Sequence, residues 1–362
     1  MPTGRGWLTV TLTFVLAAVA VWALTFYVRA LSLSVGWSDK HARAQAERGP
    51  ASNAGGLAIF GGVVVALVAA TLLRGIVVKG VQIQVLAMLL GGSFLLMSGF
   101  VDDQFGLPRA IRWVSQIAAA LLLVACGIRI HVSFGGHLAV AYSVIFTVIW
   151  ILVIINVVEF IDDVDGLAAG VSFITAVCLL AVSAQFQGTG RAGSTLLMAG
   201  VAGASLGFLR HNFPPARAVM GDSGAYFLGY VIAAASILGH LKIHAVFALG
   251  PTALFVLFPT LRMARVMVRR LLRRRNPLVI GGLTQRDHRI LTRLSPVRTC
   301  LVLWGFSLVL NVAGMVREHM SLSVILTTVV GVLVLLAAIL LVPRPLGTGH
   351  RLRSKPESER SG

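Results

Sequence analysis

The sequence predicts an all-α polytopic membrane protein with about eleven transmembrane helices. Of the 362 residues, 57% are hydrophobic and only 12% are charged. A soluble domain carries about 25% charged residues. The hydrophobic residues are gathered in runs of helical length, and a run of about 20 apolar residues can cross a bilayer. These observations exclude an ordinary water-soluble fold.

The candidate spans are apolar runs separated by segments that contain Gly, Pro or charged residues. The first run is too long for the core of a signal peptide, so we expect it to be retained. We interpret residues 1–342 as a single integral membrane domain, and the basic segment 343–362 as a disordered cytoplasmic tail. The runs are 7–28, 55–73, 82–101, 113–128, 138–157, 167–186, 194–209, 224–240, 245–261, 299–316 and 322–342.

The basic residues indicate how the chain is oriented. Most of the 31 Lys and Arg lie in the loops after odd-numbered runs and in the C-terminal tail. Because basic residues accumulate on the cytoplasmic side, we expect a periplasmic N-terminus and a cytoplasmic C-terminus in a bacterial inner membrane. The net charge of +18 then indicates anionic lipid head groups and phosphorylated substrates as partners, and no nucleic acid.

The first acidic cluster ends the third run. Asp102 and Asp103 are adjacent there, and Arg109 and Arg112 follow within three turns. The C-terminal end of a helix dipole is an unfavourable place for carboxylates. The pair therefore indicates a metal site, or a base whose protonation depends on its neighbour.

The second cluster lies in NVVEFIDDVDGLAAG, residues 156–170, which follows the fifth run without a linker. It contains Glu159, Asp162, Asp163 and Asp165. Crowded carboxylates repel one another and need a cation or water to stay charged. The alternative interpretation is a solvated helix end followed by an acidic first turn, which the helix dipole favours.

The third cluster precedes the eighth run, in GDSG at residues 221–224. Either Asp222 or Ser223 could cap the following helix. The same helix N-terminus could also seat a phosphate, with Asp222 holding a cation that bridges to it.

Basic and small residues complete the set of candidates. Lys40 lies in the first loop, and Gly55-Gly56 opens the second run, where glycines permit close helix packing. The basic run 262–275 is typical of an anchor for anionic lipid. His288 is the lone histidine of the loop 262–298, which begins with this basic run. Three cysteines far apart in the sequence predict neither a metal site nor a disulfide.

All the acidic clusters and His288 fall in loops that the orientation places on one side. We therefore expect an active site in a cleft that faces the cytoplasm.

These motifs resemble the polyprenyl-phosphate N-acetylhexosamine-1-phosphate transferases (glycosyltransferase family 4), including undecaprenyl-phosphate GlcNAc-1-phosphate and O-antigen initiating types, over about residues 30–295. FVDDQFGL is similar to the family's paired-Asp motif, NVVEFIDDVDGLAAG to its Asn-rich stretch, and NFPPARAVMGDSGAYFLG to its GD motif. Glu159 and Asp163 stand where the family pattern has Asn and Gly, and Val219 where it has an aromatic residue. The histidine motif retains only His288, which is typical of O-antigen members and argues against the peptidoglycan-precursor branch.

The resemblance implies transfer of a sugar-1-phosphate from a UDP-sugar to undecaprenyl phosphate, which yields a lipid-linked sugar diphosphate and UMP. It implies Mg²⁺, with Mn²⁺ as an alternative, bound by Asp222 close to Asp102 and Asp103. Whether one of that pair deprotonates the lipid phosphate, orients it or attacks as a nucleophile stays open. The implied catalytic residues are Asp102, Asp103, Asp162 and His288, and the implied substrate contacts are Lys40, Arg112, Asn156, Asp165 and Arg289.

Two other functions are compatible with the same residues. A cation-coupled transporter would use membrane carboxylates to bind ions, although it predicts them near the middle of the spans. A catalytically inactive scaffold would explain the altered histidine motif. The donor sugar, the length of the lipid chain and the oligomeric state, a homodimer included, stay open.

Overall fold

The computed structural model describes residues 4–35, 55–74, 83–131, 138–162, 164–185, 192–238, 296–317 and 321–341. The secondary structure elements of these residues are α-helices, so the all-α class is confirmed. The helices are α1 (Gly4–Val35), α2 (Gly55–Arg74), α3 (Ile83–Phe105), α4 (Arg109–Ala125), α5 (Ala139–Asp162), α6 (Leu167–Gln185), α7 (Ala192–Asn212), α8 (Gly221–Leu238), α12 (Pro296–Arg317) and α13 (Leu322–Leu341).

The described helices coincide with the predicted apolar runs, while the run 245–261 lies outside the described residues. Among the described helices, six are long and apolar enough to cross a membrane, namely α1, α2, α3, α5, α6 and α8. This confirms a polytopic membrane protein, and the count of about eleven spans stays a prediction. Exposed apolar side chains such as Trp22, Leu72 and Val114 suit surfaces that face lipid.

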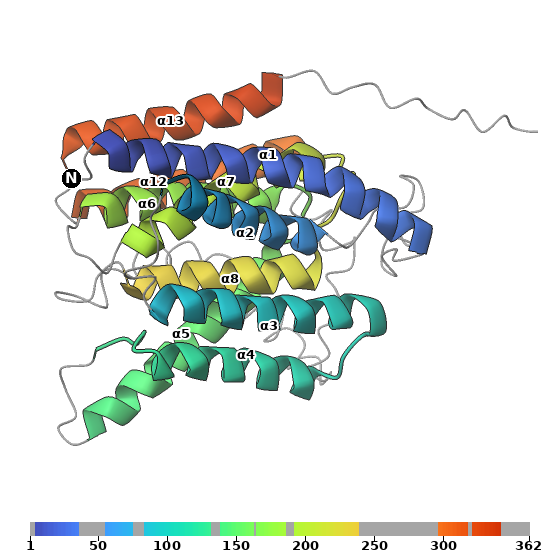
Figure 1. Ribbon diagram of the computed structural model, residues 1–362, viewed down its shortest axis with the longest axis vertical. Helices are drawn as coiled ribbons and strands as arrows, with labels where there is room; N and C mark the ends of the chain where they lie inside the picture. Colours follow the sequence, from blue (N-terminus) through green and yellow to red (C-terminus); the bar gives the residue numbers. More distant parts are fainter. Residues whose placement is uncertain are drawn as a thin grey trace, which may run out of the picture.

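Helix α8 lies at the centre of the described bundle. It contacts α2, α3, α5, α6 and α7, and Figure 1 shows it running between α2 and α3. Every residue from Ser223 to Leu238 is buried. A helix that is apolar on all sides belongs inside a bundle, and α8 therefore fixes where its neighbours end.

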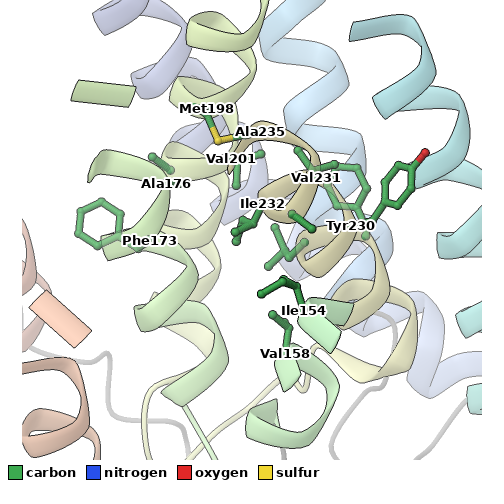
Figure 2. Close-up of a cluster of buried hydrophobic side chains, with 14 of the residues drawn as sticks. Ile154, Val158, Phe173, Ala176, Met198, Val201, Tyr230, Val231, Ile232 and Ala235 are labelled. Carbon is green, nitrogen blue, oxygen red and sulfur yellow. The ribbon is translucent and has the colours of Figure 1, made fainter. Parts of the chain in front are cut away.

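The core around α8 combines side chains from four helices, as Figure 2 shows. Ile154 and Val158 come from α5, while Phe173 comes from α6 and Met198 from α7. They belong to the same buried cluster as Val231 and its neighbours on α8.

Glycines bring α2 and α3 close to the start of α8. A Cβ added to Gly56 would lie 2.3 Å from the Gly224 nitrogen, and one added to Gly99 would lie 2.6 Å from the carbonyl carbon of Asp222. The backbone of Gly56 also donates to the Met220 carbonyl at 3.0 Å. The predicted role of Gly55-Gly56 in close helix packing is confirmed.

Candidate active site

The acidic clusters meet at one end of the bundle. Helix α3 ends there, and Gly106, with φ of +71°, turns the chain into α4. Gly106 donates its backbone N–H to the Asp102 carbonyl at 2.8 Å, which closes the last turn of α3. Figure 1 shows this turn at the same end of the bundle as the C-terminal end of α1.

Arg112, in the first turn of α4, is the centre of the site. Its Nε forms an ion pair with Oδ2 of Asp102. Its Nη1 lies 3.6 Å from Oε1 of Glu159 on α5 and 3.7 Å from Oδ2 of Asp222 on α8. One guanidinium therefore joins carboxylates from three other helices, and we call these four residues the Arg112 cluster.

Asp102 is the most deeply buried member of this cluster. Its side chain is fully buried, whereas those of Arg112, Glu159 and Asp222 are 25–32% exposed. Its Oδ1 accepts a hydrogen bond of 2.7 Å from the backbone N–H of Leu107. A buried charge requires such partners, so Asp102 fixes Arg112 against the end of α3.

Asp103 has a different role, because its carboxylate caps α8. Its Oδ1 accepts from the Asp222 N–H at 2.9 Å, and its Oδ2 accepts from the Ser223 N–H at 3.2 Å. A carboxylate at a helix N-terminus satisfies free N–H groups and interacts favourably with the helix dipole.

Asp162 completes the capping of α8. Its Oδ2 accepts a hydrogen bond of 3.0 Å from the Gly221 N–H. The capping groups are therefore carboxylates from α3 and α5, and the prediction that Asp222 or Ser223 itself caps α8 is wrong. A phosphate seated on these same N–H groups does not fit this arrangement, because Asp103 and Asp162 already accept from them.

The donor set fits a divalent cation. The carboxylates of Asp103 and Asp222 lie close enough for their charges to repel, and a cation would relieve that repulsion. Within the described ranges no group of three or more His, Cys, Asp or Glu side chains has metal-binding geometry. Mg²⁺ is commonly held by only one or two carboxylates, together with water and substrate phosphates. Asp103 and Asp222 would be the residues that hold it.

A second set of contacts ties the turn after α5 to the loop before α8. Oδ2 of Asp165 accepts from the Ala216 N–H at 3.1 Å. The Gly166 N–H donates to Oδ1 of Asn212 at 2.9 Å, and Nδ2 of Asn212 donates to the Ala218 carbonyl at 3.0 Å. These bonds hold the segment before α8 against the turn that follows α5.

Asn156 joins α5 to α4. Its Nδ2 donates to Oε1 of Gln116 and to the Leu152 carbonyl, both at 2.7 Å. It lies one turn before Glu159 on α5, next to the Arg112 cluster. Its contacts show a role in packing, and its predicted contact with substrate stays a prediction.

The structure thus brings together Asp102, Asp103, Arg112, Asp162 and Asp222, with Asn156 and Asp165 close by. Lys40, Asp163, His288 and Arg289 lie outside the described residues.

Two residues of this region were missed by the sequence analysis. Asn212 is the first residue of the NFPPARAVMGDSG motif, so its position in the motif was an available signal. Tyr226 lies in the same motif, but its neighbours are apolar and it was interpreted only as part of a span.

The protein is a helical membrane bundle, and carboxylates from several helices converge where its central helix, α8, begins. The model of the family described as Glycosyl transferase family 4 matches residues 85–240, which include the whole Arg112 cluster. The chain is similar to this family over these residues, and the predicted resemblance is confirmed.

Three relatives make the comparison specific. A protein of Bacillus subtilis named as a probable undecaprenyl-phosphate N-acetylglucosaminyl 1-phosphate transferase is 27% identical over 86% of each chain. A decaprenyl-phosphate N-acetylglucosaminephosphotransferase of Mycobacterium tuberculosis is 34% identical over 61% of this chain and 58% of the relative. An undecaprenyl-phosphate alpha-N-acetylglucosaminyl 1-phosphate transferase of Thermotoga maritima is 27% identical over 62% of this chain and 68% of the relative.

Proposed function

We propose that this chain transfers N-acetylhexosamine-1-phosphate from a UDP-sugar to undecaprenyl phosphate. An oxygen of the lipid phosphate attacks the phosphorus that carries the sugar. The bond from that phosphorus to the bridging oxygen breaks, and UMP leaves with the bridging oxygen. The product is a lipid-linked sugar diphosphate, the first intermediate of a cell-surface polysaccharide of the O-antigen kind.

The Arg112 cluster is the observation that carries this proposal. A guanidinium held among carboxylates from three other helices provides a positive charge for phosphate and acidic oxygens for a cation. The cluster lies where apolar helices end, which is where a lipid phosphate meets the membrane surface. The names of the relatives supply the expected acceptor and sugar.

Each side chain has a separate task in this reaction. Arg112 exchanges part of its contact with Glu159 and Asp222 for the phosphates, whose charge it neutralises. Asp103 keeps the first turn of α8 in place, so that the Asp222 carboxylate stays directed at the site. A bound Mg²⁺ or Mn²⁺ would supply Lewis acid stabilisation of the phosphates.

The remaining assignments belong to the same proposal. Asp165 and Asn156 position the nucleotide, and Asp102, Asp103, Asp162 and His288 take part in the chemistry. Lys40 and Arg289 contact phosphates. The site faces the cytoplasm of a bacterial inner membrane, where UDP-sugars are made, and anionic lipids surround the protein.

The test is turnover by the purified full-length protein in liposomes with undecaprenyl phosphate, UDP-GlcNAc and Mg²⁺. The wild type should release UMP, and Asp222→Asn should lower the rate by about a hundredfold, as expected when one charge-stabilising group is removed. Ser93→Ala is the matched control, because the Ser93 hydroxyl is exposed and bonds to Leu90 within its own helix.

Three results would oppose the proposal. Wild-type turnover by a folded Asp222→Asn protein would refute the role of Asp222. Cation-driven uptake into vesicles without UMP release would favour the transporter instead. A folded wild type without turnover on any UDP-N-acetylhexosamine would favour the scaffold.

A further inference from the structure

The hydroxyl of Tyr226 is an unexplained polar group in the interior of the bundle. Tyr226 is 0% exposed, and its Oη has no hydrogen-bond partner among the described residues. A buried tyrosine hydroxyl usually finds a partner, because leaving it without one costs free energy. Such a group therefore calls for a functional explanation.

Tyr226 lies beside the Arg112 cluster. It follows Asp222 by one helical turn of α8, a spacing that places two side chains on the same face. The charges of Glu159, Asp222 and Arg112 all act on its hydroxyl. The hydroxyl is therefore next to the groups that would receive the substrate phosphates, although it donates to none of them.

The next tyrosine of α8 shows what a structural hydroxyl looks like in this bundle. Tyr230 is also 0% exposed. Its Oη contacts the carbonyl oxygen of Ala87 on α3 at 3.3 Å and that of Ala119 on α4 at 3.1 Å. Tyr230 thus links three helices, whereas Tyr226, one turn away, has no comparable bond within the described part of the chain.

We propose that Tyr226 contacts the substrate, and that its hydroxyl donates a hydrogen bond to a phosphate oxygen of the bound nucleotide sugar. The assignment rests on the proposed function for the identity of that ligand. A phenol is a neutral donor, so it can bind a phosphate oxygen beside Glu159 and Asp222 without placing another charge there. Arg112 would approach the same phosphate from α4, which surrounds the anion with donors from two helices.

The experiment compares Tyr226→Phe with Tyr230→Phe in the full-length protein in lipid nanodiscs. Calorimetry measures the affinity for UDP with Mg²⁺ present, inorganic diphosphate is tested as a competitor, and thermal unfolding is followed without ligand. Tyr226→Phe should weaken UDP and diphosphate binding by about tenfold, as expected for a lost hydrogen bond to a charged group, and leave the Tm unchanged or higher. Tyr230→Phe should lower the Tm and leave both affinities unchanged.

The outcomes separate this inference from the proposed function. A folded wild type that binds neither UDP nor UDP-GlcNAc would overturn the function itself. Wild-type binding with equal affinities in Tyr226→Phe would overturn the role of Tyr226 alone. A fall in Tm like that of Tyr230→Phe would make the hydroxyl structural. If Tyr226→Phe binds UDP more weakly but diphosphate competes as well as in the wild type, the Tyr226 hydroxyl contacts a part of UDP other than its phosphates, which would overturn the proposed phosphate contact.

Discussion

Replacing Arg112 by Met should destabilise the protein mainly through Asp102. The Asp102 side chain is fully buried and pairs with the Arg112 Nε. Removing one partner of a buried ion pair costs about 3–5 kcal/mol, because the other charge stays buried without compensation. The Leu107 N–H still donates to Asp102 in the variant, so we expect the lower part of this range.

Double-mutant cycles isolate each pair within the Arg112 cluster. With Asp102→Asn the coupling to Arg112→Met should be about 2 kcal/mol or more, since the neutral amide no longer needs the guanidinium. With Glu159→Gln it should be below about 1 kcal/mol, because that pair is partly exposed and 3.6 Å apart.

The assay is unfolding of the purified variants by SDS in mixed micelles, followed by tryptophan fluorescence and circular dichroism. Equal couplings for the two pairs, or a larger coupling to Glu159, would refute the reasoning from burial.

Two further predictions concern the start of α8. Asp103→Ala removes the acceptor of two backbone N–H groups and should lower the free energy of unfolding in SDS by about 2–4 kcal/mol. Asp103→Asn keeps one acceptor and should lower it by about half as much. Equal losses of stability in the two variants would contradict the capping role. Gly99→Ala places a Cβ 2.6 Å from the Asp222 backbone, so α3 and α8 must separate, and both Tm and turnover should fall. The control is Gly305→Ala on α12, where an added Cβ meets no atom within 4 Å, and this variant should be more stable by about 0.5–1 kcal/mol. Unchanged Tm and turnover in Gly99→Ala would show that α3 and α8 separate at little cost.

The spans could be predicted from the sequence because lipid imposes a simple rule on the chain. Backbone groups in hydrocarbon must bond within the segment, so length and hydropathy mark each helix. The orientation of the loops then predicted that Asp102 and Asp222 share one end of the bundle, which agrees with their common contact to Arg112. The sequence does not predict which face of each helix packs against its neighbours, because Leu and Val suit a contact with lipid and a contact with another helix equally.

The partners within the site could not be predicted, because they are distant in sequence. Capping rules relate a helix to residues within a few positions of its start, whereas Asp103 is 119 residues before the Asp222 N–H to which it bonds. For this reason the GDSG segment offered only Asp222 and Ser223 as candidate caps. The pairing of Glu159 with Arg112 likewise depends on how α4 and α5 pack, which no local pattern contains.

The charges of the site make a specific demand on any phosphate ligand. Among the described residues of the site, carboxylates outnumber the guanidinium, because Arg112 lies among Asp102, Glu159 and Asp222, and Asp103 lies beside Asp222. On the proposed function the nucleotide and the lipid phosphate are anions as well, so repulsion opposes their binding unless cations enter with them.

Binding of UDP and of Mg²⁺ should therefore be coupled, and the coupling must be equal in both directions. We expect Mg²⁺ to raise the affinity for UDP at least about tenfold, a coupling near 1.4 kcal/mol. UDP should raise the affinity for Mg²⁺ by the same factor, and Asp222→Asn should reduce that factor. Titration calorimetry of each ligand at fixed concentrations of the other measures both. Affinity for UDP that does not change with Mg²⁺, in a wild type that turns over, would show that basic side chains balance the phosphates without the cation.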